Sequence, residues 1–252
     1  MKKLALTIVA AMAMTGAALA QGYVNWAPVS STVTFETNTA ASPLFGGTGT
    51  GGVSGLTGVA AGGFDYALLY QSTPNGALSS DTAVWDGTWT GAAGNTGTAM
   101  TGVNGTGLAT HAGWVTANTV NGQSGSGVQV AWANGVTNSV ILVGWSTSLG
   151  STWAGVSNIL AQLALGNSAP LTAQLAGAMG FFGETTIGNV NPAAASPGNP
   201  IFFTSSTPLA NSDPIFSLNT QMYQLVPVPE PATMALAGLG GLSLLLFRRQ
   251  RK

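Results

Sequence analysis

The stretch GVQVAWANGVTNSVILVGWSTS, residues 127–148, carries the clearest fold information in the chain. Apolar residues alternate with small or polar ones from Val128 to Trp132, which is the two-residue period of a half-buried strand. Asn134-Gly135 then forms a typical two-residue turn signal, and an apolar run from Val140 to Trp145 follows it. The stretch therefore predicts a β-hairpin.

Short apolar segments separated by turn signals recur along the rest of the chain, which favours an all-β fold. Helical spacing is clear only in GVSNILAQLALGN (155–167) and weaker in LTAQLAGAMGFFG (171–183), whereas the glycine-rich segment 46–58 is typical of a flexible loop. We expect one ectodomain, residues 21–227, that folds as a single β-sandwich or jelly roll. The predicted strands are GYVNWAPV (22–29), STVTFET (31–37), GFDYALLYQS (63–72), PIFFTS (200–205) and PIFSLNTQMYQLVPV (214–228).

Charge is distributed very unevenly along the chain. No Lys or Arg lies between Lys3 and Arg248, and the chain has no cysteine. The interior therefore cannot neutralise phosphates, which argues against a nucleic-acid partner, and it holds neither a disulfide nor a thiolate metal site. Seven tryptophans and a low net charge argue against disorder.

The N-terminal residues 1–20 have the pattern of a secretory signal peptide. Lys2 and Lys3 precede a run of small and apolar residues, and the segment closes on Ala18-Leu19-Ala20, a small-x-small cleavage pattern in which Ala18 and Ala20 are the small residues. Gln21 is then the first residue of the exported protein.

The C-terminus has the pattern of a membrane anchor. Residues 232–247 carry no charge, and a helix of this length covers roughly 24 Å of a hydrocarbon core about 30 Å thick. Snorkelling of the flanking basic side chains covers the mismatch. The positive-inside rule places the basic tail, residues 248–252, in the cytoplasm and the ectodomain outside. The anchoring basic residues are Arg248, Arg249, Arg251 and Lys252.

The order of features in residues 228–252 resembles the sorting signal of PEP-CTERM proteins, the substrates of exosortases. Val228, Pro229, Glu230 and Pro231 form an extended motif, which precedes the apolar run and the basic cluster. The resemblance covers about a tenth of the chain. It implies an exosortase-type membrane enzyme as partner, recognition through the four motif residues, cleavage near them, and delivery to the cell surface or an exopolysaccharide matrix.

Few residues in the body of the chain carry recognisable chemistry. Asp81 and Asp86 lie beside Trp85 and Trp89 in SSDTAVWDGTW (79–89), which is a candidate glycosidase arrangement because that reaction needs two carboxyl groups. The alternative is that Asp86-Gly87 is a turn and Asp81 caps a loop. Trp85, Trp89 and Trp153 lie in polar, glycine-rich surroundings and are candidate sugar contacts on the surface.

Two further patterns are weak. His111 is the single histidine, so it cannot form a zinc site without clustered carboxylates, and no nucleophile motif accompanies it. A G-x-G-x-x-G match at Gly47, Gly49 and Gly52 lacks a following helix and favours a loop over a dinucleotide site.

We therefore expect a non-enzymatic, exported surface or extracellular-matrix protein, associated with exopolysaccharide or biofilm. A carbohydrate-binding module is the alternative, and a secreted glycosidase using Asp81 and Asp86 is a third hypothesis. We expect no cofactor, no metal, no catalytic residue and no nucleic-acid partner. Before processing, the membrane is a partner through residues 232–247.

Overall fold

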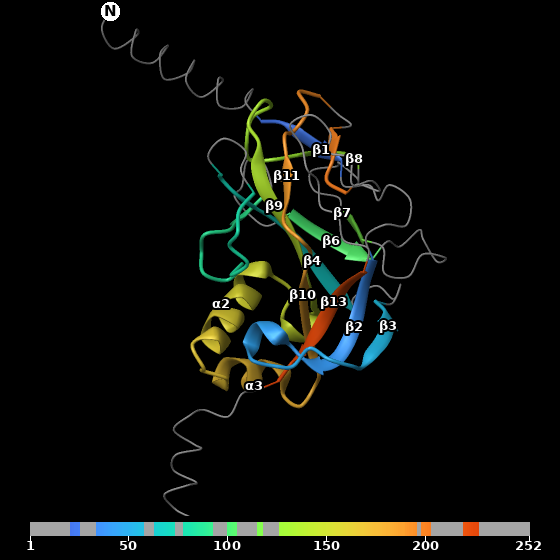
Figure 1. The fold of residues 1–252 in the computed structure, drawn as a ribbon, viewed down its shortest axis with the longest axis vertical. Helices are drawn as coiled ribbons and strands as arrows, with labels where there is room; N and C mark the ends of the chain where they lie inside the picture. Colours follow the sequence, from blue (N-terminus) through green and yellow to red (C-terminus); the bar gives the residue numbers. More distant parts are fainter. Residues whose placement is uncertain are drawn as a thin grey trace, which may run out of the picture.

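The computed structural model describes a mostly β domain with two sheets and two α-helices (Figure 1). The prediction of a mostly β fold is confirmed at this level. The described residues are 21–25, 34–57, 63–73, 78–92, 100–104, 115–117, 126–195, 198–202 and 219–226.

The larger sheet forms the centre of the domain. β9, the second half of the predicted hairpin, is buried at every residue, which fits an uninterrupted apolar run in a strand covered on both faces. In spatial order the strands are β3 (Val53–Leu56), β2 (Thr34–Ala41), β13 (Asn219–Leu225), β10 (Gly180–Glu184), β9 (Asn138–Ser146), β4 (Phe64–Gln71), β6 (Met100–Asn104) and β7 (Val115–Ala117), with β11 (Gly188–Val190) paired to β9 and β5 (Thr90–Gly91) paired to β4.

The last strand of the chain is a central strand of this sheet. β13 pairs with β2 in parallel, from Asn219 opposite Thr34 onward, and with β10 in antiparallel, where Leu225 lies opposite Gly180. Its backbone is therefore bonded to a neighbouring strand on each side. The segment between β2 and the glycine-rich stretch contains the 3₁₀ turn η1 (Pro43–Phe45), and β3 forms an edge strand within residues that we expected to be a loop.

A three-stranded sheet lies beside the large one, and it shows that the predicted hairpin is wrong. Its order is β12 (Asn199–Pro200), β1 (Tyr23–Asn25) and β8 (Ser126–Gln129). β8 pairs with β1, where Val128 lies opposite Val24, whereas β9 pairs with β4 and β10 in the large sheet.

The turn between β8 and β9 is nevertheless present. The Val136 amide donates to the Ala133 carbonyl at 3.2 Å, and Gly135 adopts φ +86°. The chain before the turn is already paired elsewhere, because the Val130 amide donates to the Gly22 carbonyl and the Gly22 amide donates to the Trp132 carbonyl. The turn therefore carries the chain from one sheet to the other instead of closing a hairpin.

Two hydrophobic cores lie on opposite faces of the large sheet. Val140 and Leu142 of β9 contribute to the core shared with the small sheet, which also holds Val128 and Trp132. Ile141, Val143 and Trp145 contribute to the second core, beneath the helices. This alternation follows the pleat of the strand.

The helices correct the all-β prediction. α2 (Trp153–Ala164) corresponds to the first segment with helical spacing, and Val156, Leu160 and Leu163 on one stripe of it are buried. α3 (Ala169–Leu175) covers only the first part of the second segment (171–183), because the residues from Gly180 onward form β10. They cover the second face of the large sheet together with the 3₁₀ turn η3 (Thr147–Leu149) and residues 78–92. A pure sandwich has two layers and would leave that face to solvent, whereas this domain has three layers: the small sheet, the large sheet and the helices.

The predicted signal peptide (1–20) and the predicted membrane anchor (232–247) lie outside the described residues. Among the helices of the part that is described, none has the length and apolar character needed to cross a membrane.

Candidate functional site

The stretch predicted as a candidate site, residues 79–89, belongs to a loop of residues 78–92 that lies on the same face of the large sheet as the helices. The Ser79 amide donates to Ser139 Oγ of β9 at 3.0 Å, and the Ala92 amide donates to the Leu68 carbonyl of β4 at 3.1 Å. Val84 and Trp89 of the loop are buried in the second core. The loop is thus fixed at both ends to two neighbouring strands.

Asp81 and Asp86 organise this loop. Asp81 Oδ1 accepts from the Ala83 amide at 2.9 Å, and Asp86 Oδ1 accepts from the Thr88 amide at 2.8 Å. Both carboxylates also lie within bonding distance of the Thr88 hydroxyl, at 2.5 Å from Asp81 Oδ2 and 2.7 Å from Asp86 Oδ1. Gly87, between Asp86 and Thr88, has φ +88°, so the predicted turn and loop cap are both present.

These bonds hold Asp81 as an anion. The Thr88 hydroxyl, the Ala83 amide and the Gln71 side chain lower the pKa of Asp81, although partial burial opposes them. A general acid needs a raised pKa at neutral pH, so Asp81 has the wrong shift for that role. The lowered pKa of Asp81 therefore does not suit the general-acid role in the predicted pair.

Burial raises the pKa of Asp65 and of Glu184, and the change is large at Glu184, which lies at the end of β10. Burial, and secondly the charge of Asp81, raise the pKa of Glu184 to about 8. Its Oε2 atom is buried and has no hydrogen-bond partner among the described residues. At neutral pH Glu184 is thus a protonated carboxylic acid near an ionised Asp81, which is the division of pKa values typical of acid–base pairs.

A bulge follows Glu184 and sets its position. Glu184 lies opposite Val143 and Gly188 lies opposite Val140, so three residues of one strand face two of β9. The Thr185 hydroxyl accepts from the Leu142 amide at 3.1 Å, and the Thr185 amide donates to the Leu142 carbonyl at 2.9 Å. The extra residue ends the regular pairing of β10 at the buried carboxyl group.

Sequence reasoning did not single out Glu184. It stands alone in GFFGETTIG (180–188), without a second acid nearby in the chain. Its relation to Asp81 depends on the pairing of β10 with β9 and on the path of a loop about a hundred residues earlier. The available signal was a charged residue directly after an apolar strand segment, and that signal is common in surface strands.

The three tryptophans predicted as sugar contacts take different positions. Trp89 is 5% exposed and its Nε1 donates to the Asp81 carbonyl at 3.1 Å, so the prediction that it lies on the surface is wrong. Trp153 is half-buried, with ring centroids 5.7 Å from Trp145 and 6.3 Å from Phe182. Trp85 is half-buried with its ring 4.9 Å from that of Phe45. Apolar packing, rather than a row of free rings, accounts for these positions.

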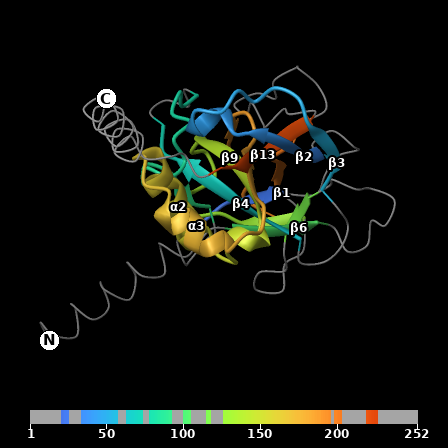
Figure 2. The same cartoon turned by 90° about the horizontal axis from the view of Figure 1, so that it is seen from below.

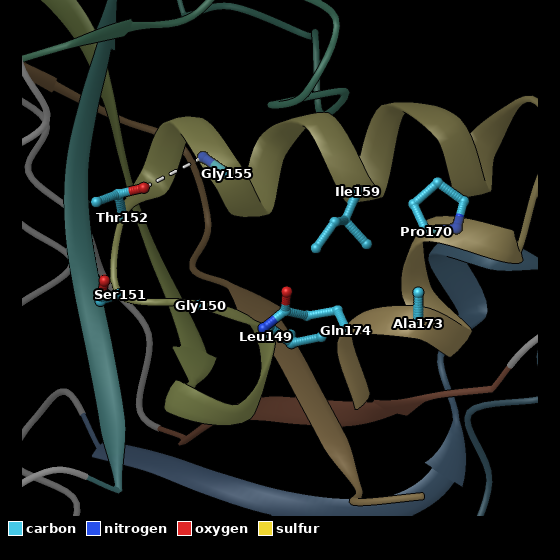
Figure 3. A pocket seen from close by; sticks show the side chains of 9 residues that line it. All are labelled: Leu149, Gly150, Ser151, Thr152, Gly155, Ile159, Pro170, Ala173 and Gln174. Atoms are coloured by element: carbon cyan, nitrogen blue, oxygen red, sulfur yellow. Dashed lines mark hydrogen bonds between the residues drawn. The ribbon is translucent and has the colours of Figure 1, made fainter. Parts of the chain in front are cut away.

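A shallow pocket of about 550 Å³ lies between η3, α2 and α3 (Figure 3). Ile159, Pro170 and Ala173 contribute apolar surface, and Gln174 donates to the Ser148 carbonyl at 3.2 Å. The remaining lining residues are Leu149, Gly150, Ser151, Thr152 and Gly155, so the lining includes no ionisable side chain. Such a pocket suits a neutral group and offers no acid or base.

Other candidate patterns receive no support as sites. No group of three or more metal-ligating side chains occurs in the ranges that the structure describes, and His111 lies outside them. Gly47, Gly49 and Gly52 lie in the turn between η1 and β3, where the next element is a strand. A dinucleotide fingerprint requires a helix at that point.

The chain's last described residue is Val226, which follows directly on the central strand β13. From there on, the sequence matches the model of the PEP-CTERM protein-sorting motif over residues 227–252. This chain carries a PEP-CTERM signal at its C-terminus. The motif covers the predicted recognition residues Val228, Pro229, Glu230 and Pro231 and the basic tail. No curated protein and no solved structure matches the chain.

The PEP-CTERM match confirms the resemblance on which the sequence interpretation depended. The motif implies export, sorting in transit through the membrane toward the cell surface, and processing by an exosortase-type enzyme. It covers the tail alone, so the role of the domain depends on the residues described above.

Proposed function

We propose that this chain is a non-enzymatic surface or matrix protein that is exported through a cleaved signal peptide, held transiently in the membrane, and released by an exosortase. The observation that carries the proposal is the PEP-CTERM motif directly after a folded β-rich domain. In this proposal residues 1–20 are removed after Ala20, residues 232–247 span the bilayer, and the basic residues of the tail lie in the cytoplasm.

The described residues support a structural role for the domain in an exopolysaccharide or biofilm matrix. The hydrogen-bonding capacity of the chain is almost entirely neutral, because it lacks Lys and Arg from residue 4 to residue 247. Neutral amide and hydroxyl groups bond sugar hydroxyls without the salt dependence of ion pairs. The two loop carboxylates, Asp81 and Asp86, are both engaged in holding their own loop.

Processing is tested in the producing bacterium with variants of the tail. Replacement of Pro229-Glu230-Pro231 by three alanines, or deletion of residues 248–252, should leave the protein in the membrane fraction with an uncleaved tail. A variant with Lys in place of Arg248, Arg249 and Arg251 keeps the charge and serves as the matched control. Normal release from the alanine and deletion variants would contradict the sorting role.

Matrix association needs a separate test, because sorting alone does not establish it. Released protein should sediment with exopolysaccharide isolated from the same cells, equally at low and high salt. Trp85→Ala and Trp153→Ala then distinguish the carbohydrate-binding alternative, since loss of specific binding in Trp85→Ala would favour a sugar site at that ring. Free protein in the supernatant under all conditions would remove the matrix proposal.

Glycoside hydrolysis is a second candidate, favoured by the opposite pKa shifts of Asp81 and Glu184. In this version Glu184 replaces Asp86 as the second carboxyl group. A screen of reducing-sugar release from polysaccharides should show activity that Glu184→Gln and Asp81→Asn abolish and Asp86→Asn retains. An active wild type with unchanged activity in Glu184→Gln would exclude this pair.

A further inference from the structure

The end of the domain where the chain leaves toward the motif has an unusual surface. Val226 follows Leu225, which lies opposite Gly180, so Val226 and Met179 are neighbours across β13 and β10. Met179 is 58% exposed and Val226 is 43% exposed. α3 and the α2–α3 connection, which contains Leu165, lie at this same end of the molecule (Figure 1). Leu165 is 80% exposed.

We name Leu165, the turn Ala176–Met179 and Val226 the exit face. Among the described residues five large hydrophobic side chains are exposed, and three of them belong to this face. The other two, Leu78 and Val136, lie near the start of β9, since the Ser79 amide bonds Ser139 and Val136 precedes Asn138. β9 spans roughly 26 Å and ends at the exit side, so Leu78 and Val136 lie at the other end of this strand from Met179 and Val226.

The exit face is also free of charge. Residues 146–183, which contain η3, both helices and the turn before β10, include no Asp, Glu, Lys, Arg or His. The helices and β13 are seen together from this end in Figure 2. A surface without charge loses no ion hydration when it leaves water, which is the condition for contact with an apolar or interfacial environment.

The distance from this face to the anchor is limited by chain length. Only residues 227–231 separate Val226 from the apolar run that starts at Ala232. At about 3.3–3.6 Å per residue, even a fully extended connection spans roughly 20 Å. The headgroup layer takes up several ångströms of this span, since it accounts for the difference between about 30 Å of hydrocarbon and about 40–45 Å of bilayer.

We propose that the exit face lies against the lipid interface while the chain is anchored by residues 232–247. This inference rests on the anchoring part of the proposed function and extends it to the folded domain. The tail keeps the face at high effective concentration near the bilayer, so a contact too weak for free protein becomes occupied. Release by cleavage of the tail then ends the contact.

The partner is the neutral interfacial zone of the bilayer rather than the charge of anionic lipids. The exit face has no basic side chain to pair with phosphate. Contact should therefore persist in vesicles of zwitterionic lipid and at high salt, where an electrostatic contact would be screened.

The absence of cysteine allows single labels to be placed in the full chain. Met179→Cys carries an environment-sensitive fluorophore, and Val136→Cys is the matched control because it is also an exposed hydrophobic residue. Leu244→Cys reports the anchor. Each full-length protein is reconstituted into phosphatidylcholine vesicles that contain lipids with a nitroxide near the headgroup or deep in the chain.

We expect quenching at position 179 by the shallow nitroxide, quenching at 244 by the deep one, and little change at 136. A chain ending at Val226 should lose the quenching at 179, and Leu165→Asp in the full chain should reduce it. Quenching at 244 without quenching at 179 would overturn the inference and leave the anchor intact. Absence of quenching at 244 would overturn the anchor itself. The same emission change of the label at position 179 on raising the protein concentration without vesicles would show that the exit face contacts a second copy of the chain. That result would overturn the lipid contact.

Discussion

The buried carboxyl group of Glu184 makes a quantitative prediction about stability against pH. Its pKa is raised from 4.5 to about 8 in the folded protein. Between these two values the folded state keeps the proton and the unfolded state releases it. The unfolded state thus binds fewer protons, and the free energy of unfolding falls as pH rises, by about 1.4 kcal/mol per pH unit for one group. From pH 5 to pH 8 this group lowers the stability by about 3.5 kcal/mol, because the slope flattens near the folded pKa.

That loss is large against the usual 5–15 kcal/mol of a folded domain. Urea unfolding of residues 21–227, followed by tryptophan fluorescence at pH 5, 6, 7 and 8, measures it for wild type and for Glu184→Gln. The glutamine variant should lose far less stability across this range. Burial also raises the pKa of Asp65. Subtracting the Glu184→Gln stability curve from the wild-type curve removes this contribution, because both proteins contain Asp65. Asp81→Asn should retain most of the wild-type slope, since burial is the larger cause at Glu184.

Equal slopes for wild type and Glu184→Gln between pH 5 and pH 8 would refute the reasoning. That result would mean that the folded protein solvates the carboxylate, and the acid–base pair with Asp81 would lose its basis.

Three other predictions follow from the packing and the charge distribution. Gly183→Ala should destabilise the domain by about 1–3 kcal/mol in urea unfolding, because the added Cβ would lie 2.5 Å from the Gln221 carbonyl oxygen. In the control Gly135→Ala the added Cβ meets no neighbour, so this variant should lose less stability despite the positive φ of Gly135. A larger loss in Gly135→Ala would contradict this. Trypsin should leave residues 4–247 uncut even in denaturant, because they contain no Lys or Arg. Chymotrypsin should cut quickly only in denaturant, because the packed cores hold the aromatic side chains out of its reach. Rapid chymotryptic cleavage throughout the native domain would argue against the packed cores. Released protein should focus at a more acidic pH than the full chain, because all six Lys and Arg lie in the two ends; equal focusing points would show that both ends are retained.

Local patterns predicted several elements correctly. The predicted strand at residues 63–72 corresponds to β4, the apolar run from Val140 to Trp145 lies within β9, and the helical spacing of 155–167 corresponds to α2. Each of these signals is contained in the segment that forms the element, so a single sequence suffices to recognise it. The turn at Asn134-Gly135 was recognised for the same reason.

Which strands pair with each other, and which side chains those pairings bury, could not be predicted from local patterns. Val128 pairs with Val24 about a hundred residues earlier, although a turn signal and a suitable strand follow it at once. Trp89 lies in a polar stretch, yet its ring is buried because the loop folds onto the helical face of the sheet. Glu184 acquires its raised pKa from the same long-range arrangement. These features depend on the sheet order, which the periodicity of a segment does not encode.

The sheet order also links folding to export. β13 fills the position between β2 and β10, so the large sheet has a gap until residues 219–225 have been delivered. The pairing of Asn219 with Thr34 joins nearly the two ends of the domain, and contacts of such long sequence separation form late. When β13 is in place, only residues 227–231 remain before the apolar run. Because the strand that closes the sheet is continuous with the sorting motif, we expect the domain to complete its fold at the stage of export at which the motif reaches the membrane.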